Sequence, residues 1–140
     1  MTKMIRVLAD GCFDCLHIGH VRHLQAARAL GDELIVALTN DQGAHKGPGR
    51  PLFGWHERWE MLMALKCVDA VLLTPNASQA IEMIRPDIYV KGIEYKHYLP
   101  ETLLVEQCGG RVILLDTKPT YSSTAIVTGQ MLNDRIRVAG

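Results

Sequence analysis

Five short apolar segments, separated by stretches with helical spacing, constrain the fold of this 140-residue chain more than any other feature. The apolar segments predict strands over residues 5–9, 34–38, 71–73, 88–90 and 112–115. The stretches between them predict helices over 17–30, 56–67, 77–84 and 101–107, and a last helix from Ser122 onward. Runs that are apolar at every position are typical of parallel strands covered on both faces. We therefore expect a single α/β domain over 1–140, Rossmann-like and doubly wound, with a five-stranded parallel sheet.

The segment 40–54 interrupts this alternation. It contains four glycines and two prolines, which favour turns over regular structure. Long loops in compact domains are usually functional or disordered, so we expect a long, mobile loop with a role in the site. Gly31, which follows the first predicted helix, is expected to form its left-handed C-terminal cap.

Charge and composition exclude some classes of partner. Fifteen Lys and Arg residues balance fifteen Asp and Glu residues, so the net charge is zero at pH 7. This balance argues against a broad basic surface for nucleic acid or for anionic membranes, but it allows a local positive pocket. No apolar stretch approaches the length of a membrane span. Four irregularly spaced cysteines do not suggest a disulfide framework, and we expect a reduced, cytoplasmic protein.

The segment between the first strand and the first helix, residues 11–20, contains the densest group of chemically active side chains. His17 and His20 are three residues apart at the opening turn of a helix, so they lie on one side of it. Free backbone N–H groups and the helix dipole make such a turn suitable for a phosphate group. Gly19 between them allows close approach to the backbone. The segment therefore predicts a phosphate or nucleotide site.

Two other chemistries are open for the same residues. Cys12, Cys15, His17 and His20 superficially form a zinc ligand set, although ten residues leave little slack to surround one ion. Cys12 and Cys15 also form a Cys-x-x-Cys pair of the kind found at redox sites. The simplest alternative is that both cysteines are small buried hydrophobic residues. A non-enzymatic nucleotide-binding, metal or redox module thus stays an alternative to an enzyme.

The pattern Gly11-x-Phe13-Asp14-x-x-His17-x-Gly19-His20 resembles the signature of the cytidylyltransferase-like nucleotidyltransferases. Three further segments resemble parts of that family: the lysine-bearing loop, the arginine that opens the next helix and the carboxy-terminal phosphate-binding turn. These segments are His45-Lys46-Gly47, Arg58 and Tyr121-Ser122-Ser123-Thr124. The resemblance implies that a substrate phosphate attacks the α-phosphorus of a nucleoside triphosphate and that pyrophosphate leaves.

The resemblance also implies roles for individual residues. The catalytic residues would be His17, His20 and Lys46. The nucleotide-binding residues would be Gly11, Cys12, Phe13, Asp14, Gly19, Arg58, Gly92, Ser122, Ser123 and Thr124. Mg²⁺ would accompany the triphosphate, and the family suggests a homodimer. Simpler roles are a solvated loop lysine for Lys46, a surface ion pair with Glu57 or Glu60 for Arg58, and a helix N-cap within 122–124.

The acceptor is indicated by the segment that follows the fourth predicted strand. Lys91-Gly92-Ile93-Glu94-Tyr95 resembles a segment of the adenylyltransferases that make ADP-heptose, which implies that Lys91 and Glu94 bind a phosphorylated sugar. The alternatives are a cytidylyltransferase for glycerol phosphate or an amino-alcohol phosphate, and an FAD synthase-type adenylyltransferase. ATP or CTP could be the donor in such a reaction. His23, one turn beyond His20, is expected at the surface.

Overall fold

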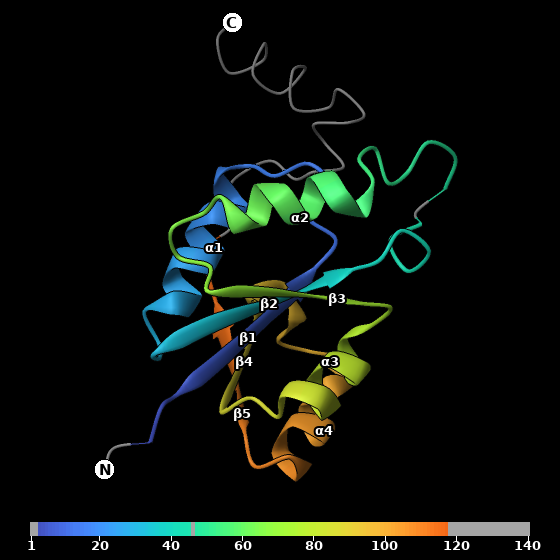
Figure 1. The fold of residues 1–140 in the computed structure, drawn as a ribbon. Coiled ribbons are helices and arrows are strands. Elements are labelled where there is room, and N and C mark those ends of the chain that lie inside the picture. Colours follow the sequence, from blue (N-terminus) through green and yellow to red (C-terminus); the bar gives the residue numbers. More distant parts are fainter. Residues whose placement is uncertain (1–2, 46, 118–140) are drawn as a thin grey trace, which may run out of the picture.

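The computed structural model describes residues 3–45 and 47–117 and contains one five-stranded sheet in this part of the chain. Its strands are β1 (Arg6–Gly11), β2 (Glu33–Thr39), β3 (Ala70–Thr74), β4 (Ile88–Gly92) and β5 (Arg111–Leu115). The helices are α1 (Ile18–Arg28), α2 (Trp55–Met63), α3 (Ala77–Ile84) and α4 (Glu101–Gln107), and a 3₁₀ turn, η1 (Ile93–Tyr95), follows β4. Every strand pair is parallel, which confirms the predicted α/β, Rossmann-like fold (Figure 1).

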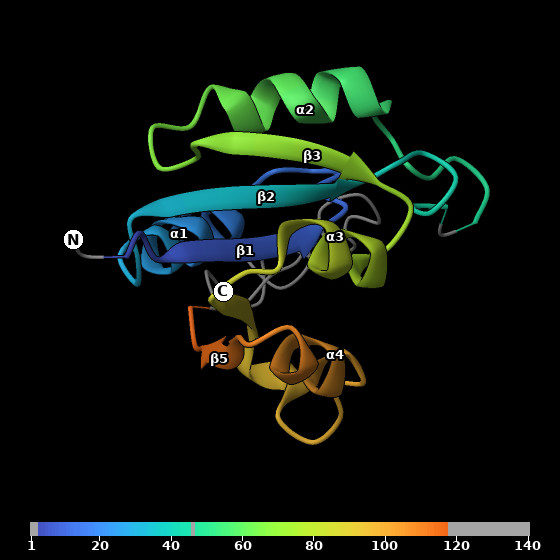
Figure 2. The same ribbon diagram turned by 60° about the horizontal axis from the view of Figure 1, so that its bottom comes forward.

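The strand order β3-β2-β1-β4-β5 places the reversal of the winding between β1 and β4. The chain first winds from β1 outward through β2 to β3, and then crosses to the other side of β1 to form β4 and β5 (Figures 1 and 2). In open parallel sheets, ligands bind beyond the carboxyl ends of the strands at such a reversal. Asp10 and Gly11 of β1 and Lys91 and Gly92 of β4 lie at that position.

Helices cover both faces of the sheet, and strand alternation divides the core into two layers. Val7 and Ala9 of β1 pack with Leu24 of α1 and Leu62 of α2. Leu8, between them in the strand, packs on the opposite face with residues of α3 and α4. Because both faces are covered, the central strands are apolar at nearly every position, which is the pattern that made the sheet predictable.

Aspartate side chains accept backbone hydrogen bonds at the edge of the sheet where the strands begin. A carboxylate oxygen of Asp32 accepts the backbone N–H of Ile5, and one of Asp87 accepts that of Arg6. Asp69 accepts the backbone N–H of Leu34 in the same way. These side chains satisfy strand donors that lack a sheet partner, so the acids at this edge are structural.

The ends of α1 and α2 and the role of Gly31 differ from the sequence predictions. The helix α1 ends at Arg28, earlier than the predicted residue 30. The helix α2 ends at Met63, earlier than the predicted residue 67. Gly31 does not have the positive φ of a left-handed cap. Among the described glycines, the residues with a positive φ are Gly47, Gly49 and Gly109. Gly31 is instead required by close approach, since a Cβ there would lie 2.8 Å from the carbonyl oxygen of Ile5.

Candidate active site

The turn from β1 into α1 is shaped by Phe13, a non-glycine residue with a positive φ of 48°. Its buried ring lies against Gly11, where an added Cβ would be 3.1 Å from the ring carbon Cε2. The same ring meets His20 edge to face, with 5.2 Å between centroids. Gly11 and Phe13 therefore fix the path of the backbone, and the Phe13 ring supports the imidazole of His20.

His17 and His20 form a reciprocal cap at the start of α1. The backbone N–H of Gly19 donates to Nδ1 of His17 at 3.0 Å, and the N–H of His17 donates to Nδ1 of His20 at 3.2 Å. The two rings are stacked with 3.9 Å between centroids. Imidazoles thus take the place that Ser or Thr and Glu occupy in an ordinary capping box.

The cap fixes the protonation pattern of both rings. A ring nitrogen that accepts a hydrogen bond carries no proton, so the neutral form of each histidine bears its proton on Nε2. Burial also lowers the pKa of His17, which favours the neutral ring near pH 7. Two stacked rings, inclined by 23°, with Nε2–H donors at a helix N-terminus can together bind an anionic phosphoryl group.

Asp14 anchors the end of the glycine-rich loop to this turn. Its buried carboxylate accepts the backbone N–H groups of Leu52 and Phe53 at 2.8 and 2.9 Å, and Nε of Arg50 at 2.9 Å. Burial raises the pKa of Asp14, but these N–H donors and the Arg50 charge outweigh it and leave the pKa below its usual value. The carboxylate therefore holds residues 50–53 against residues 11–20, which we call the signature segment.

Arg58 lies at the centre of the same assembly, with 1% of its side chain exposed. Its guanidinium donates to the carbonyl oxygens of Cys12, Thr39 and Phe53 at 2.7 to 3.0 Å and to Asp41 at 2.6 Å. Four of its five N–H donors are thus occupied by protein oxygens. A surface ion pair with Glu57 or Glu60 was the wrong alternative, because burial of a guanidinium requires partners on every side.

Lys91 and Asp10 meet across the reversal between β4 and β1. The Lys91 ammonium lies 3.0 Å from Oδ1 of Asp10 and 4.6 Å from the centre of the Tyr95 ring. The hydroxyl of the buried Tyr89 donates to the same Oδ1 at 2.9 Å. Burial lowers the pKa of Lys91, but the Asp10 carboxylate outweighs it and the pKa is raised. Lys91 is therefore a charged group at the ligand edge of the sheet.

Gly92 and Glu94 form a second contact at this edge. A Cβ on Gly92 would overlap the present position of the Glu94 carboxylate, so a larger residue there would displace that side chain. Gly92 thereby has a steric role that the sequence does not reveal. The prediction that it contacts the nucleotide stays a prediction.

Sequence reasoning missed three residues here. Asp10 follows the predicted strand 5–9 and Arg50 lies in the segment 40–54, and the sequence patterns gave a role to neither. His23 was expected at the surface, which is wrong: it is half-buried, and burial lowers its pKa against the opposing charge of Glu94. The signal for His23 was its spacing, since residues 17, 20 and 23 fall on one side of α1.

Other expectations lie elsewhere in the chain. Lys46, Ser122, Ser123 and Thr124 fall outside the described residues, so their predicted roles stay predictions. Cys12 and Cys15 form no disulfide, and both are half-buried. Within residues 3–45 and 47–117, no three His, Cys, Asp or Glu side chains are grouped so that they could hold a metal ion.

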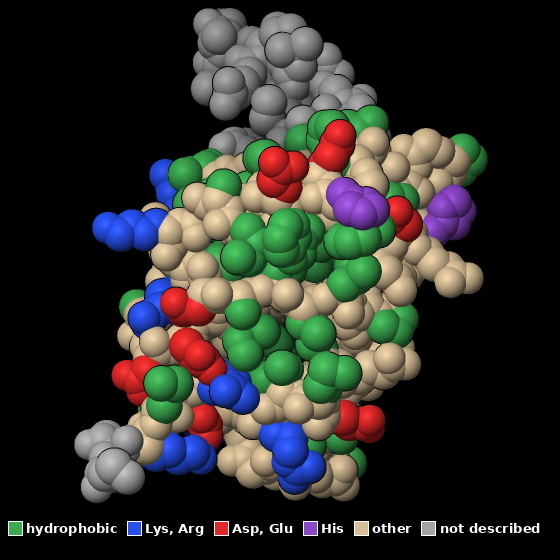
Figure 3. Space-filling view, viewed as in Figure 1, with side chains coloured by type: hydrophobic (Ala, Val, Ile, Leu, Met, Phe, Trp, Pro, Cys, Tyr) green, Lys and Arg blue, Asp and Glu red, His purple; other side chains and the backbone are tan. Residues whose placement is uncertain are grey.

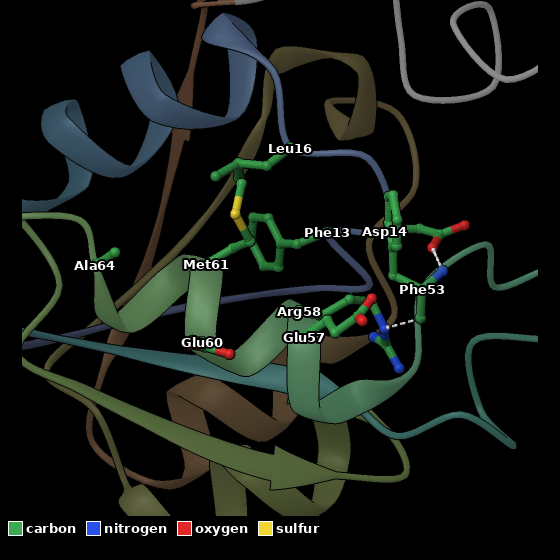
Figure 4. A pocket seen from close by; sticks show the side chains of 9 residues that line it. All are labelled: Phe13, Asp14, Leu16, Phe53, Glu57, Arg58, Glu60, Met61 and Ala64. Atoms are coloured by element: carbon green, nitrogen blue, oxygen red, sulfur yellow. Dashed lines mark hydrogen bonds between the residues drawn. The ribbon is translucent and has the colours of Figure 1, made fainter.

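A pocket of about 470 Å³ opens on the α2 side of the signature segment. Its lining includes Phe13, Leu16, Phe53 and Met61, whose side chains point toward the opening in Figure 4. The residues that line it do not include His17, His20 or Lys91. The pocket is mainly apolar, and the charged groups that can handle phosphate lie on the α1 side and at the β1–β4 edge.

Comparisons with known proteins agree with this arrangement. A family model described as cytidylyltransferase-like matches residues 8–129. The bifunctional protein HldE of Syntrophotalea carbinolica is 45% identical over 129 residues, and HldE of Streptomyces coelicolor is 44% identical over 128 residues. Each match covers 86% of this chain but only 26% and 27% of the relative. The chain therefore spans about a quarter of the length of these curated relatives.

Solved structures with the same fold include a lipopolysaccharide core biosynthesis protein from Thermoplasma volcanium. Its sequence is 30% identical, the TM-score is 0.68, and the match covers 86% of this chain and all of that one. A pantoate-beta-alanine ligase from Francisella tularensis is 13% identical with a TM-score of 0.61, over 98% of this chain and 73% of that chain. The second likeness shows the fold alone.

The family match, over residues 8–129, spans the complete signature segment and all of the sheet except Arg6 and Val7 of β1. It confirms the resemblance carried by Gly11, Phe13, Asp14, His17 and His20. The part of the chain that the structure describes contains no helix long and apolar enough to cross a membrane. The chain belongs to the cytidylyltransferase-like family.

Proposed function

We propose that this chain transfers a nucleoside monophosphate from ATP or CTP to a phosphorylated sugar and forms an activated precursor for surface-polysaccharide synthesis. The observation that carries the proposal is the pair of stacked imidazoles of His17 and His20 at the N-terminus of α1. Their position at the carboxyl edge of a parallel sheet is where such folds bind nucleotides.

The reaction balances without a covalent enzyme intermediate. A phosphate oxygen of the acceptor attacks the α-phosphorus and forms a new P–O bond, while the bond from the α-phosphorus to the bridging oxygen breaks. The electron pair of that bond leaves with pyrophosphate. The protein has to align two polyanions and stabilise the charge on the transferred group.

The chain offers donors for this task. The Nε2–H groups of His17 and His20 would donate to the α-phosphoryl oxygens, and Gly11 and Gly19 would let the nucleotide approach the backbone. Lys46 would neutralise the phosphates, and Ser122, Ser123 and Thr124 would bind the departing β- and γ-phosphates. The nucleotide would bring its own Mg²⁺.

Asp14 and Arg58 would act through the residues they hold. Asp14 fixes residues 50–53, and Arg58 binds the carbonyl oxygen of Cys12 in the signature segment. We therefore assign both as positioning residues for the nucleotide site, with Cys12 and Phe13 lining it.

A sugar phosphate is favoured as the acceptor by the relatives and by the segment 91–95. The relatives named HldE are similar over this domain, and the Thermoplasma volcanium protein is named for lipopolysaccharide core biosynthesis. The segment that contains Lys91 and Glu94 resembles that of the ADP-heptose-forming enzymes. Heptose phosphate is accordingly the first acceptor to test.

A homodimer and a cytoplasmic location complete the proposal. Trp59, Met61 and Met63 of α2 and Leu73 of β3 are exposed, and hydrophobic side chains gather over these elements in Figure 3. An exposed apolar area of this kind is typical of an interaction surface. None of the four cysteines, all of which lie in the described residues, forms a disulfide, in keeping with a reducing compartment. Light scattering would give the mass of the particle in solution.

The experiment that tests the function is a pyrophosphate-release screen. ATP and CTP are each combined with a heptose 1-phosphate, a hexose 1-phosphate, glycerol 3-phosphate and ethanolamine phosphate. We expect release with a sugar phosphate that depends on both substrates. Release with glycerol 3-phosphate or ethanolamine phosphate alone would favour the cytidylyltransferase alternatives, and release with none would contradict the proposal.

A further inference from the structure

The apolar pocket beside α2 is walled by three segments of the chain. Phe13 and Leu16 come from the signature segment, Phe53 from the end of the glycine-rich loop, and Met61 and Ala64 from α2 and its C-cap. Phe53 and Met61 are 42% and 54% exposed, and Figure 4 shows Phe13, Leu16 and Met61 around one opening. Because contact of apolar surface with water is unfavourable, a cavity of about 470 Å³ with this lining favours an apolar occupant.

An occupant of this pocket packs against the residues that support the histidine cap. The Phe13 ring meets the His20 ring edge to face, with 5.2 Å between centroids. Leu16 directly precedes His17, the first residue of that cap. Neither histidine lines the pocket, so the pocket is separate from the imidazoles themselves.

The pocket takes only one of the exposed sides of α2. Arg58 and Leu62 of this helix are buried. Among its exposed apolar residues, Met61 lines the pocket, whereas Trp59 and Met63 do not. Trp59 and Met63 therefore stay available to the homodimer surface proposed above while the pocket is filled.

Two acidic side chains give the pocket a negative rim. Glu57 and Glu60 line it and are exposed, and neither takes part in an ion pair among the residues that the structure describes. The other charged residues of the lining, Asp14 and Arg58, are already paired with opposite charges. The uncompensated charge is thus negative, and an occupant with basic as well as apolar side chains would complement it.

The chain contains a segment of that composition beyond the family match. The match ends at residue 129, and residues 130–140 follow it outside the described part of the chain. This segment has one acidic residue, two arginines and four larger apolar residues. They are Asp134, then Arg135 and Arg137, and Met131, Leu132, Ile136 and Val138. The segment therefore complements the pocket both in hydrophobicity and in charge.

The segment is also close enough along the chain to reach the pocket. The described chain ends at Thr117, just after β5, whose Leu115 packs in the same core layer as Leu62 of α2. Three strand spacings, about 15 Å in all, separate β5 from β2, against which α2 packs. Residues 118–129 span about 18 Å as a helix and about 40 Å when extended, so either conformation covers that separation.

We propose that residues 130–140 dock in the pocket of the same chain. The apolar side chains of the segment cover the lining around Met61, and Arg135 and Arg137 lie beside Glu57 and Glu60. Docking removes the apolar lining from water and holds the segment against the turn that carries the histidine cap. It needs neither a ligand nor a second molecule, so it is independent of the proposed function.

NMR of the wild-type chain tests the docking directly. We expect backbone order parameters of about 0.85 for residues 131–138. We also expect contacts between the methyl groups of Leu132 or Ile136 and those of Leu16 or Met61. Order parameters below about 0.6, or contacts of the segment with another part of the fold, would overturn the proposal.

Trypsin cleavage measures how strongly the apolar contact holds the segment. Trypsin cleaves after arginine, and docking protects the bonds after Arg135 and Arg137, so that cleavage follows the population of the undocked form. In Met61→Glu, which places a charge in the pocket, we expect cleavage at these bonds to be about tenfold faster than in the wild type.

Met63→Glu is the matched control for this variant. Met63 is an exposed methionine of the same helix that lies outside the pocket, and its variant should be cleaved within about twofold of the wild-type rate. Equal cleavage rates in Met61→Glu and Met63→Glu would contradict docking at this pocket.

Removal of the acidic rim tests the charge complementarity. The double variant Glu57→Gln, Glu60→Gln keeps the apolar lining and should speed the same cleavage by about threefold at low ionic strength, and by less at high ionic strength. The matched control is Glu82→Gln, Glu106→Gln, which removes two exposed acids of α3 and α4 over the opposite face of the sheet. It should leave the rate unchanged. Because the rim variant keeps the shape of the pocket, it decides the matter even if Met61→Glu does not fold; an unchanged rate would overturn the proposed pairing.

A second copy of the chain is the other occupant that the pocket could receive. A mixture of molecules with different isotope labels distinguishes the two cases. Contacts between Met61 and residues 130–140 should be found only within one molecule. Contacts that join two molecules would assign the pocket to an interface between copies and overturn the proposal.

Discussion

Nε of Arg50 lies 2.9 Å from Oδ2 of Asp14, and this buried contact joins the glycine-rich loop to the signature segment. The same carboxylate accepts two consecutive backbone N–H groups, those of Leu52 and Phe53. A loop that is long in sequence is therefore fixed at its carboxyl end, four residues after Lys46. The position of residues 50–53 depends on one carboxylate.

Replacing Asp14 by Asn should destabilise the protein. The substitution leaves the Arg50 guanidinium without its counter-charge, and breaking a buried pair costs about 3 kcal/mol. We expect the free energy of unfolding, measured by urea denaturation, to fall by about that amount. Asp116→Asn, at an exposed position, is the control and should change it by less than about 0.5 kcal/mol. Equal stability of the two variants would contradict the role given to Asp14.

Replacing Arg58 by Lys should be costly although the charge is kept. A lysine has three donors on a single nitrogen and cannot reach the carbonyl oxygens of Cys12, Thr39 and Phe53 together. We expect a loss of about 2–4 kcal/mol in the free energy of unfolding and a higher KM for the nucleotide. Arg111→Lys, on an exposed residue, should change neither quantity. A stable variant that lost only nucleotide affinity would show that Arg58 contacts the nucleotide directly.

Much of the fold follows from local patterns, as the outcome for β1 and β2 illustrates. Apolar runs identified these strands because both faces of the sheet are covered, and the helices between them were found from their spacing. The role of Gly31 could not be foreseen, because it depends on a close contact with Ile5, 26 residues away in the chain. Close approach of distant segments leaves no local signature.

The site was predictable to a similar extent. The signature segment identified His17 and His20 because their chemistry depends on short spacing at a helix start. The pairing of Asp10 with Lys91 depends on β1 lying beside β4, and only the strand order brings them together. Burial of Arg58 likewise depends on three carbonyl oxygens from separate segments. Such long-range pairings were beyond the reach of sequence patterns.

Replacing Gly31 by Ala should destabilise the fold. The new Cβ would be 2.8 Å from both the carbonyl oxygen of Ile5 and Cγ2 of Val7, so the backbone of β1 would have to shift. Overpacking of this kind costs about 1–3 kcal/mol, which a thermal or urea transition would reveal. Gly54→Ala is a suitable control, because its nearest contact would be an ordinary 3.8 Å from Asp41. A Gly31→Ala protein as stable as this control would contradict the close approach.

Stability should decrease on mild acidification because of His23. Its pKa in the folded protein is below the usual 6.5, mainly through burial and also through Lys91, against the opposing fields of Glu94 and Asp10. A base with a depressed pKa contributes stability that is complete above pH 6.5 and is lost as the pH falls through its folded value.

The comparison of His23→Gln with the wild type tests this linkage. The free energy of unfolding should depend less steeply on pH below 6.5 in the variant, as followed by urea denaturation at a series of pH values. His97→Gln, at an exposed position, should leave the slope unchanged. A slope in His23→Gln equal to that of the wild type would rule out His23 as its source.

The central claim is nucleotidyl transfer directed by His17 and His20, and ³¹P NMR of one reaction mixture tests it most directly. With ATP or CTP, a heptose 1-phosphate and the wild-type protein, we predict a new sugar–nucleotide diphosphate signal and pyrophosphate in equal amounts. His17→Ala and His20→Ala should each form both products at least about 100-fold more slowly. Inorganic phosphate in place of the diphosphate signal, or full activity in both variants, would contradict the account.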